Sequence, residues 1–192
     1  MTKRFLTLLI AVAASLALIG SAQAAYAPVE PYSSYQPQTK CSPTAKAGAK
    51  ALAKWVVASY SGRQGRIASP CAGSSVSEHK EGRALDWTLN SKSATDRARA
   101  SRFLTRIFAT DSEGERHALA RRMGVMYIIW SDRIYSSYNG FSAKVYRSSS
   151  CRNKPLSRCS MTLRHRDHVH ISLSRSGGYG QTSFYVGKVP AN

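Results

Sequence analysis

The sequence predicts an α+β domain with an antiparallel or mixed central sheet and helices packed against it. Helical and strand patterns occupy separate blocks of the chain, and two strand patterns are parted by only two residues, as in a hairpin. Four cysteines in 192 residues add the prospect of disulfide staples. No internal repeat is present, and the length suits one domain.

The first 24 residues predict a secretory signal peptide. Lys3 and Arg4 precede an apolar run, and Ala22 and Ala24 have the small-x-small spacing that signal peptidase recognises. Cleavage after Ala24 would give a secreted protein, extracellular or associated with the cell wall. An uncleaved anchor fits less well because the apolar run is short for a spanning helix. No later segment is apolar enough to cross a membrane, so the mature form should have no integral membrane segment.

The start of the mature chain predicts a tail and then a helix. Residues 25–40 are rich in Pro, Tyr and Ser without apolar periodicity, which indicates a flexible tail ahead of a single domain over 41–192. The helix should begin with Ser42 as its N-cap and Pro43 in its first position, and end near Gly62. Its apolar residues recur at helical spacing: Leu52, Trp55, Val56 and Tyr60.

The rest of the chain alternates strand and helix patterns in blocks. Alternating apolar residues over 83–89 predict a strand, and 93–124 predict two helices. Residues 125–138 predict a hairpin, and 167–174 predict a further strand. The Gly-rich end should carry one weak strand at most.

The cysteines predict two disulfides, because the chain is expected in an oxidising compartment. Spacing alone allows three pairings. We predict Cys41 with Cys71, which would pin the N-terminal helix, and Cys151 with Cys159, which closes a small loop. A four-cysteine zinc site is the rival interpretation, but no CxxC pair is present.

The formal charge of +18 predicts attraction to polyanions. Anionic cell-wall polymers, nucleic acid and acidic membrane surfaces all qualify, and charge of this kind does not choose among them.

The histidines and one aspartate indicate a metal site. Positions two apart on a strand share a face, so His168 and His170 can reach one point. Asp86 lies on the non-core face of its strand, where a carboxylate needs a cation or hydrogen-bond donors. A hydrolytic zinc takes three such ligands and leaves the fourth position to water, and His79, Asp86 and one histidine of this pair meet that count. An H-x-H pair on a strand also occurs where both histidines only form cross-strand hydrogen bonds, and a His-to-Asp spacing of seven often occurs by chance.

A base is still useful to move the proton of the attacking water. His168 and the adjacent Asp167 are both in range by sequence.

Two segments resemble a known family. Residues 77–86, SEHKEGRALD, match the S-x-H-x-x-G-x-A-x-D pattern of the zinc D-alanyl-D-alanine carboxypeptidases and dipeptidases at every fixed position. The later DHVH, residues 167–170, resembles the closing element of that group. These enzymes belong to the LAS metallopeptidases, which share the hedgehog/DD-peptidase fold. Residues 123–137, MGVMYIIWSDRIYSS, followed by residues 165–174, HRDHVHISLS, resemble small secreted actinobacterial proteins that carry this domain. The resemblance covers about residues 42–175.

The resemblance implies one zinc per chain, held by His79, Asp86 and His170. It implies that His168 assists the water or stabilises the transition state. The carboxypeptidase branch has a glutamate where this chain has Asp167, so Asp167 is the second candidate for the base.

The resemblance also implies a substrate-binding arginine upstream of the first motif. Arg63 and Arg66 are the candidates, because the guanidinium fork suits a terminal carboxylate. Ser77, a fixed position of the pattern, is the third expected substrate-binding residue. The expected position of His165 is the surface, and a position behind the metal ligands is the alternative.

The sequence therefore predicts a secreted, monomeric zinc peptidase that cleaves peptidoglycan stem peptides next to a D-residue. Its positive charge would help hold it to peptidoglycan or another anionic wall polymer. The first alternative is a non-catalytic zinc-containing module that binds the wall or a protein. The other alternative is a secreted nuclease. It ranks below both the peptidase and the binding module, so nucleic acid is not the expected partner.

Overall fold

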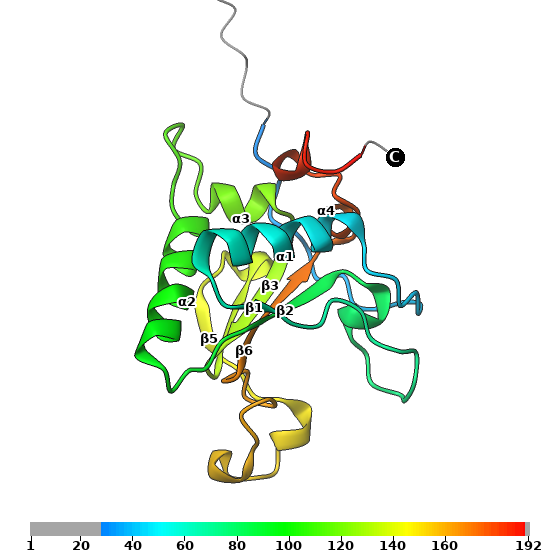
Figure 1. Cartoon of the computed structure of the whole chain (residues 1–192), viewed down its shortest axis with the longest axis vertical. Coiled ribbons are helices and arrows are strands. Elements are labelled where there is room, and N and C mark those ends of the chain that lie inside the picture. Colours follow the sequence, from blue (N-terminus) through cyan, green and yellow to red (C-terminus); the bar gives the residue numbers. More distant parts are fainter. Residues whose placement is uncertain (1–27, 191–192) are drawn as a thin grey trace, which may run out of the picture.

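The computed structural model describes residues 28–190, and in that range a six-stranded antiparallel sheet is combined with four α-helices (Figure 1). The strand order is β1-β2-β6-β3-β4-β5. This confirms the α+β prediction and selects the antiparallel alternative. The strands are β1 (Arg63–Gln64), β2 (Ala84–Thr88), β3 (Val125–Trp130), β4 (Arg133–Ser136), β5 (Ala143–Val145) and β6 (His168–Leu173). The helices are α1 (Ala47–Tyr60), α2 (Ala94–Ile107), α3 (Ala118–Arg122) and α4 (Arg175–Tyr179).

The main core lies between the sheet and helices α1 and α2. Trp87 of β2 and Val169 and Ile171 of β6 are fully buried in it. Their neighbours in the strands therefore face the other side of the sheet, as the alternating pattern predicts. The helices contribute fully buried apolar side chains to the same cluster: Leu52, Val56, Phe103 and Ile107.

The first helix begins later than predicted. It starts at Ala47 with Lys46 in the N-cap position, and Ser42 is not its cap. The backbone N–H of Ser42 donates to the carbonyl of Lys80 at 2.7 Å, and the Ser42 hydroxyl accepts a hydrogen bond from the Lys46 ammonium. The Ser42 hydroxyl, which would have capped the helix, is therefore bound by a side chain four residues on and not by a backbone N–H group.

The Gly-rich end, expected to hold one weak strand at most, forms helix α4 and no strand in its described part, residues 174–190. Helix α4 packs so closely on α1 that a Cβ atom on Gly48 would lie 2.0 Å from the carbonyl oxygen of Gly177. Glycine has low helix propensity, but here the missing side chain permits contact between the two helix backbones.

The remaining predicted elements are confirmed. Helices α2 and α3 fall inside 93–124, and β6 falls inside 167–174. Strands β3 and β4 form the hairpin, with Ser131 and Asp132 both at positive φ, as the favoured two-residue hairpin turn requires. The short strands β1 and β5 were not predicted.

Both predicted disulfides are present, Cys41–Cys71 and Cys151–Cys159. The first ties the segment before α1 to the segment before the first motif. The second closes a loop that precedes β6.

Residues 28–40, expected as part of a flexible tail, lie against the folded body. Gln38 accepts a hydrogen bond from the backbone N–H of Ser77 at 2.8 Å, and the backbone N–H of Thr39 donates to Glu81 at 3.1 Å. The carbonyl of Gln36 accepts a hydrogen bond from the Arg83 guanidinium. This segment thus contacts both ends of the turn that carries His79.

The predicted signal peptide, residues 1–24, lies outside the described residues. Within residues 28–190, no helix combines the length and the apolar character that crossing a bilayer requires.

Candidate metal centre

Three side chains predicted as metal ligands meet on the sheet face opposite the main core. Asp86 of β2 and His170 of β6 are direct cross-strand partners, and His79 reaches them from the turn before β2. Asp86 Oδ1 lies 3.1 Å from both His79 Nε2 and His170 Nδ1. The two histidine nitrogens are 3.2 Å apart. The sequence motifs, 84 positions apart at Asp86 and His170, therefore form one cluster.

The turn that carries His79 is a short 3₁₀ helix, Glu78–Glu81. Its N-cap is Ser77, whose hydroxyl accepts a hydrogen bond from the His79 backbone N–H at 3.3 Å. Gly82 ends it with φ +66°, and a Cβ there would lie 2.0 Å from the Thr44 carbonyl oxygen. Two fixed positions of the first motif thus shape the backbone around the ligand. Ser77, predicted to bind substrate, lines the cavity but also has this capping role.

The hydrogen-bond partners of the two rings define which nitrogens carry protons. His79 Nδ1 lies 3.0 Å from the carbonyl oxygen of Ile67, which can only accept, so Nδ1 is protonated and Nε2 has the lone pair. The Ser172 hydroxyl donates to buried Glu78 at 3.3 Å, so its oxygen is left to accept from His170 Nε2 at 2.9 Å. His170 Nδ1 therefore also has a free lone pair.

Two lone pairs and a carboxylate oxygen consequently point at one another. A positive charge is needed among them, whether a proton or a metal ion, because their mutual repulsion is otherwise uncompensated. Tetrahedral zinc with ligand bonds of about 2.0–2.1 Å places its ligand atoms roughly 3.3 Å apart. The observed separations of 3.1, 3.1 and 3.2 Å are close to that value. The donor set and its spacing thus fit zinc.

The protonation states also suit a metal. Burial alone would raise the pKa of Asp86, but where a proton on His170 or His79 supplies the positive charge, the hydrogen bond to Asp86 outweighs burial and holds its pKa well below its usual range. Burial lowers the pKa of His170 and so favours the neutral ring. An ionised carboxylate and neutral imidazoles are the forms that bind metal ions.

His168 and Asp167 form a pair beside the three donors. His168 Nδ1 lies 2.7 Å from Asp167 Oδ1, a carboxylate oxygen that accepts the ring proton. His168 Nε2 therefore has a lone pair, and it lies 3.6 Å from Asp86 Oδ1. Asp167 also accepts a hydrogen bond from the Thr162 hydroxyl. Of the two predicted candidates for the base, His168 faces the metal site and Asp167 orients it.

His165 is not the surface residue that was expected. It lines the cavity, and its ring centroid lies 4.7 Å from that of His168. Among residues 28–190 its Nδ1 atom is buried without a hydrogen-bond partner. Burial, together with His170 and His168, lowers the pKa of His165 to about 3, so the ring is neutral. With these two histidines it forms a second group that could hold a metal ion.

An open cavity of about 270 Å³ borders the site. Arg66 lines it, whereas Arg63 lines a neighbouring cavity of about 510 Å³ that Asp167 also borders. Of the two arginines predicted to bind substrate, Arg66 is therefore the one beside the metal ligands.

Sequence reasoning missed the groups behind His170. Glu78 is 3% exposed and accepts hydrogen bonds from the hydroxyls of Tyr127 and Ser172. The Tyr127 ring is stacked on His170, with 5.6 Å between the centroids. Ser172 could have been found, because it shares a strand face with His168 and His170. Tyr127 could not, because its position depends on the register between β3 and β6.

Comparison with known proteins gives one match. Residues 41–155 match the family model described as VldE, C-terminal domain. The match includes His79 and Asp86 but ends before β6. No curated protein and no solved structure matches the chain.

Proposed function

The chain belongs to the VldE C-terminal domain family, and from the site built on this domain we propose that it is a secreted zinc peptidase that acts on peptidoglycan stem peptides. One observation carries the proposal: three metal donors at near-tetrahedral spacing lie beside an oriented histidine in an open cavity. The motif resemblance supports the finer assignment to the D-alanyl-D-alanine carboxypeptidase type and the hedgehog/DD-peptidase fold.

His79, Asp86 and His170 would hold the zinc. When bound, it would lower the pKa of a coordinated water to about 7 and polarise the carbonyl of the scissile bond. Glu78 and Ser172 would keep His170 in the tautomer that presents Nδ1.

His168 would carry the proton. Its Nε2 lone pair accepts the proton of the attacking water, and the resulting imidazolium returns it to the nitrogen of the leaving amine. Asp167 accepts the Nδ1 proton, so it fixes the tautomer and stabilises the imidazolium. In this scheme Asp167 contacts His168 and not the reacting atoms, so its role is to position His168.

Arg66 would bind the substrate carboxylate. It is the cationic side chain that lines the cavity together with the ligands, and its guanidinium can pair with a carboxylate through two hydrogen bonds. Two disulfides suit an oxidising compartment outside the cytoplasm, which agrees with the predicted signal peptide.

The first test is the metal content of mature protein, residues 25–192, measured by inductively coupled plasma mass spectrometry. We expect about one zinc per chain, which His170→Ala should lose. His117→Asn serves as a matched control, because His117 lies outside the cavity and asparagine tolerates its left-handed backbone. A chain that stays empty after zinc is supplied would overturn the ligand assignment.

The second test is cleavage of soluble peptidoglycan fragments, followed by mass spectrometry. Wild-type protein should create new termini, and His168→Ala should not, although it keeps its zinc. A non-catalytic zinc module remains the alternative, because the Asp167 carboxylate, which stands where the carboxypeptidases have glutamate, is directed to His168 and Thr162. Zinc-loaded wild-type protein that leaves every fragment intact would favour that module.

A further inference from the structure

The loop before β6 is strongly and uniformly basic. Residues 147–164, here called the basic loop, contain five Arg or Lys residues and no Asp or Glu. In Figure 1 this yellow-to-orange segment extends away from the sheet, beyond the rest of the domain. Positive charge is therefore concentrated in a part of the described chain that projects from the domain.

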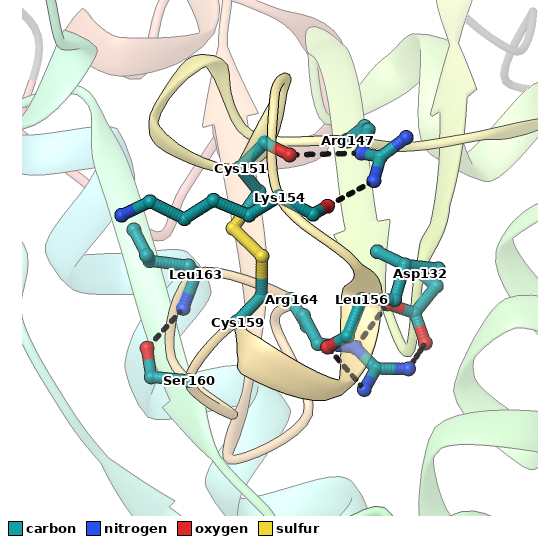
Figure 2. The surroundings of a disulfide bond; sticks show 9 residues. All are labelled: Asp132, Arg147, Cys151, Lys154, Leu156, Cys159, Ser160, Leu163 and Arg164. Atoms are coloured by element: carbon teal, nitrogen blue, oxygen red, sulfur yellow. Dashed lines mark hydrogen bonds and ion pairs between the residues drawn. A yellow bond between two sulfur atoms is a disulfide. The ribbon is translucent and has the colours of Figure 1, made fainter.

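Two of its arginines hold the loop backbone in place beside the Cys151–Cys159 disulfide (Figure 2). Arg147 donates to the carbonyl oxygens of Cys151, at 3.0 Å, and Lys154. Arg164 donates to the Leu156 carbonyl at 3.2 Å and makes a two-pronged ion pair with Asp132, at 2.8 and 3.0 Å. The loop is thus preorganised, which lowers the entropy cost of binding a partner.

The other three cations of the loop are free to bind. Residues 152–158 are all exposed. Among residues 28–190, the side chains of Arg152, Lys154 and Arg158 have no hydrogen-bond or ion-pair partner within the protein. Figure 2 shows the Lys154 ammonium pointing away from the disulfide and from both arginines. A loop held by a disulfide and by internal hydrogen bonds therefore presents three unpaired cations to the solvent.

The basic loop begins and ends at the candidate metal centre. Tyr146, immediately before it, and Thr162, near its end, both line the site cavity. His165, which follows the loop, lines the same cavity. A polymer that leaves the cavity on this side consequently meets the loop next.

We propose that the basic loop is a docking surface for the free carboxylates of peptidoglycan, on stem peptides next to the one in the cavity. The inference rests on the proposed function for its choice of polymer. Guanidinium groups match carboxylates in shape and charge, and the loop is continuous with the cavity in which the scissile peptide would lie. If the three loop cations were merely hydrated, replacing them should weaken binding no more than replacing exposed cations elsewhere on the protein.

The experiment compares two triple variants with the same change in net charge. One carries Arg152→Gln, Lys154→Gln and Arg158→Gln in the loop. The matched control carries Lys50→Gln, Lys54→Gln and Arg102→Gln, three exposed positions on α1 and α2. Both also carry His168→Ala, so that the polymer is not cut. Thermal melting verifies that each variant is folded.

Binding is measured by co-sedimentation with insoluble peptidoglycan stripped of phosphodiester polymers. The same material is also tested after its carboxylates have been amidated with carbodiimide. We expect the loop variant to bind about tenfold more weakly than its parent, and the control less than about twofold. On amidated peptidoglycan the difference between the two should disappear.

Three results would overturn the docking surface. Equal losses in both variants would show a general charge effect, and a loop effect that survives amidation would show another ligand group. A loop effect seen only with unstripped walls or with double-stranded DNA would assign the loop to phosphates. Cleavage of soluble stem peptides by wild-type protein is measured separately, so its failure would count against the proposed function and not against the loop.

Discussion

Ser172 Oγ lies 2.9 Å from His170 Nε2, on the other side of the ring from the nitrogen that faces Asp86. Replacing Ser172 with alanine removes the acceptor for a buried N–H group, and the ring loses the contact that fixes its tautomer. We expect zinc affinity to fall about 10- to 100-fold. Competition with a chromophoric chelator measures this. Unchanged affinity would mean that the ring is fixed by its other neighbours.

Glu78 and Glu81 are both buried, and both lie near the Arg83 guanidinium. Only Glu78 is connected to a metal ligand through hydrogen bonds. Glu78→Gln should weaken zinc binding, whereas Glu81→Gln should lower the free energy of unfolding by about 1–3 kcal/mol and leave the affinity of the folded protein unchanged. Chelator competition and urea denaturation separate the two effects. Equal zinc affinities in both variants would contradict a role for the hydrogen bonds that connect Glu78 through Ser172 to His170.

His168→Ala should reduce the rate of peptide cleavage by about 10²- to 10⁴-fold, the usual contribution of a general base. Asp167→Asn should cause a smaller loss, because His168 remains but its tautomer is no longer fixed. Both variants should keep one zinc per chain. A larger loss from Asp167→Asn than from His168→Ala would reverse the two roles.

Metal removal should lower thermal stability. Treatment with a chelator should decrease the melting temperature, and added zinc should restore it. Zinc at 100 times its dissociation constant stabilises the folded state by about 2.7 kcal/mol. Calorimetry of wild-type protein and of His79→Ala, which should not respond to zinc, tests this. An equal response in the variant would place the metal elsewhere.

Gly82→Ala should be among the most damaging glycine substitutions. Gly82 has φ +66° and no space for a Cβ beside the Thr44 carbonyl, whereas Gly140 has φ +59° with nothing within 4 Å. Gly140→Ala should therefore lower the free energy of unfolding only by the backbone strain, about 1–2 kcal/mol. Gly82→Ala should lower it clearly more. Denaturation curves compare them. Similar losses would mean that the Gly82 turn moves to make room.

The sequence predicted the parts of the fold that local patterns determine. The hairpin, β2 and β6 follow from alternation and turn length, and the two disulfides match the pairing chosen among the three that cysteine spacing allows. The start of α1 and the nature of α4 do not, because they depend on contacts between distant segments. Ser42 bonds to Lys80, and Gly177 packs on Gly48. Strands of two or three residues, such as β1, have too few positions to show a pattern.

The candidate site likewise contains residues that the sequence could predict and residues that it could not. Its proposed metal ligands belong to two recognisable motifs, so the sequence could name them. His165 and Glu78 could not be assigned, because their roles come from burial and not from residue type. His165 has positive φ and lines the cavity, and no local pattern predicts that backbone conformation.

The cross-strand pairing of Asp86 with His170 has an evolutionary consequence. Two of the three donors are held by the register of β2 on β6, although 84 positions separate them in the chain. Insertions or deletions in the loops between these strands could lengthen, shorten or recharge the surface around the cavity without moving the donors. A slip of one residue in either strand, by contrast, would turn its donor toward the core. Selection on relatives of this chain should therefore act strictly on strand pairing and loosely on loop length.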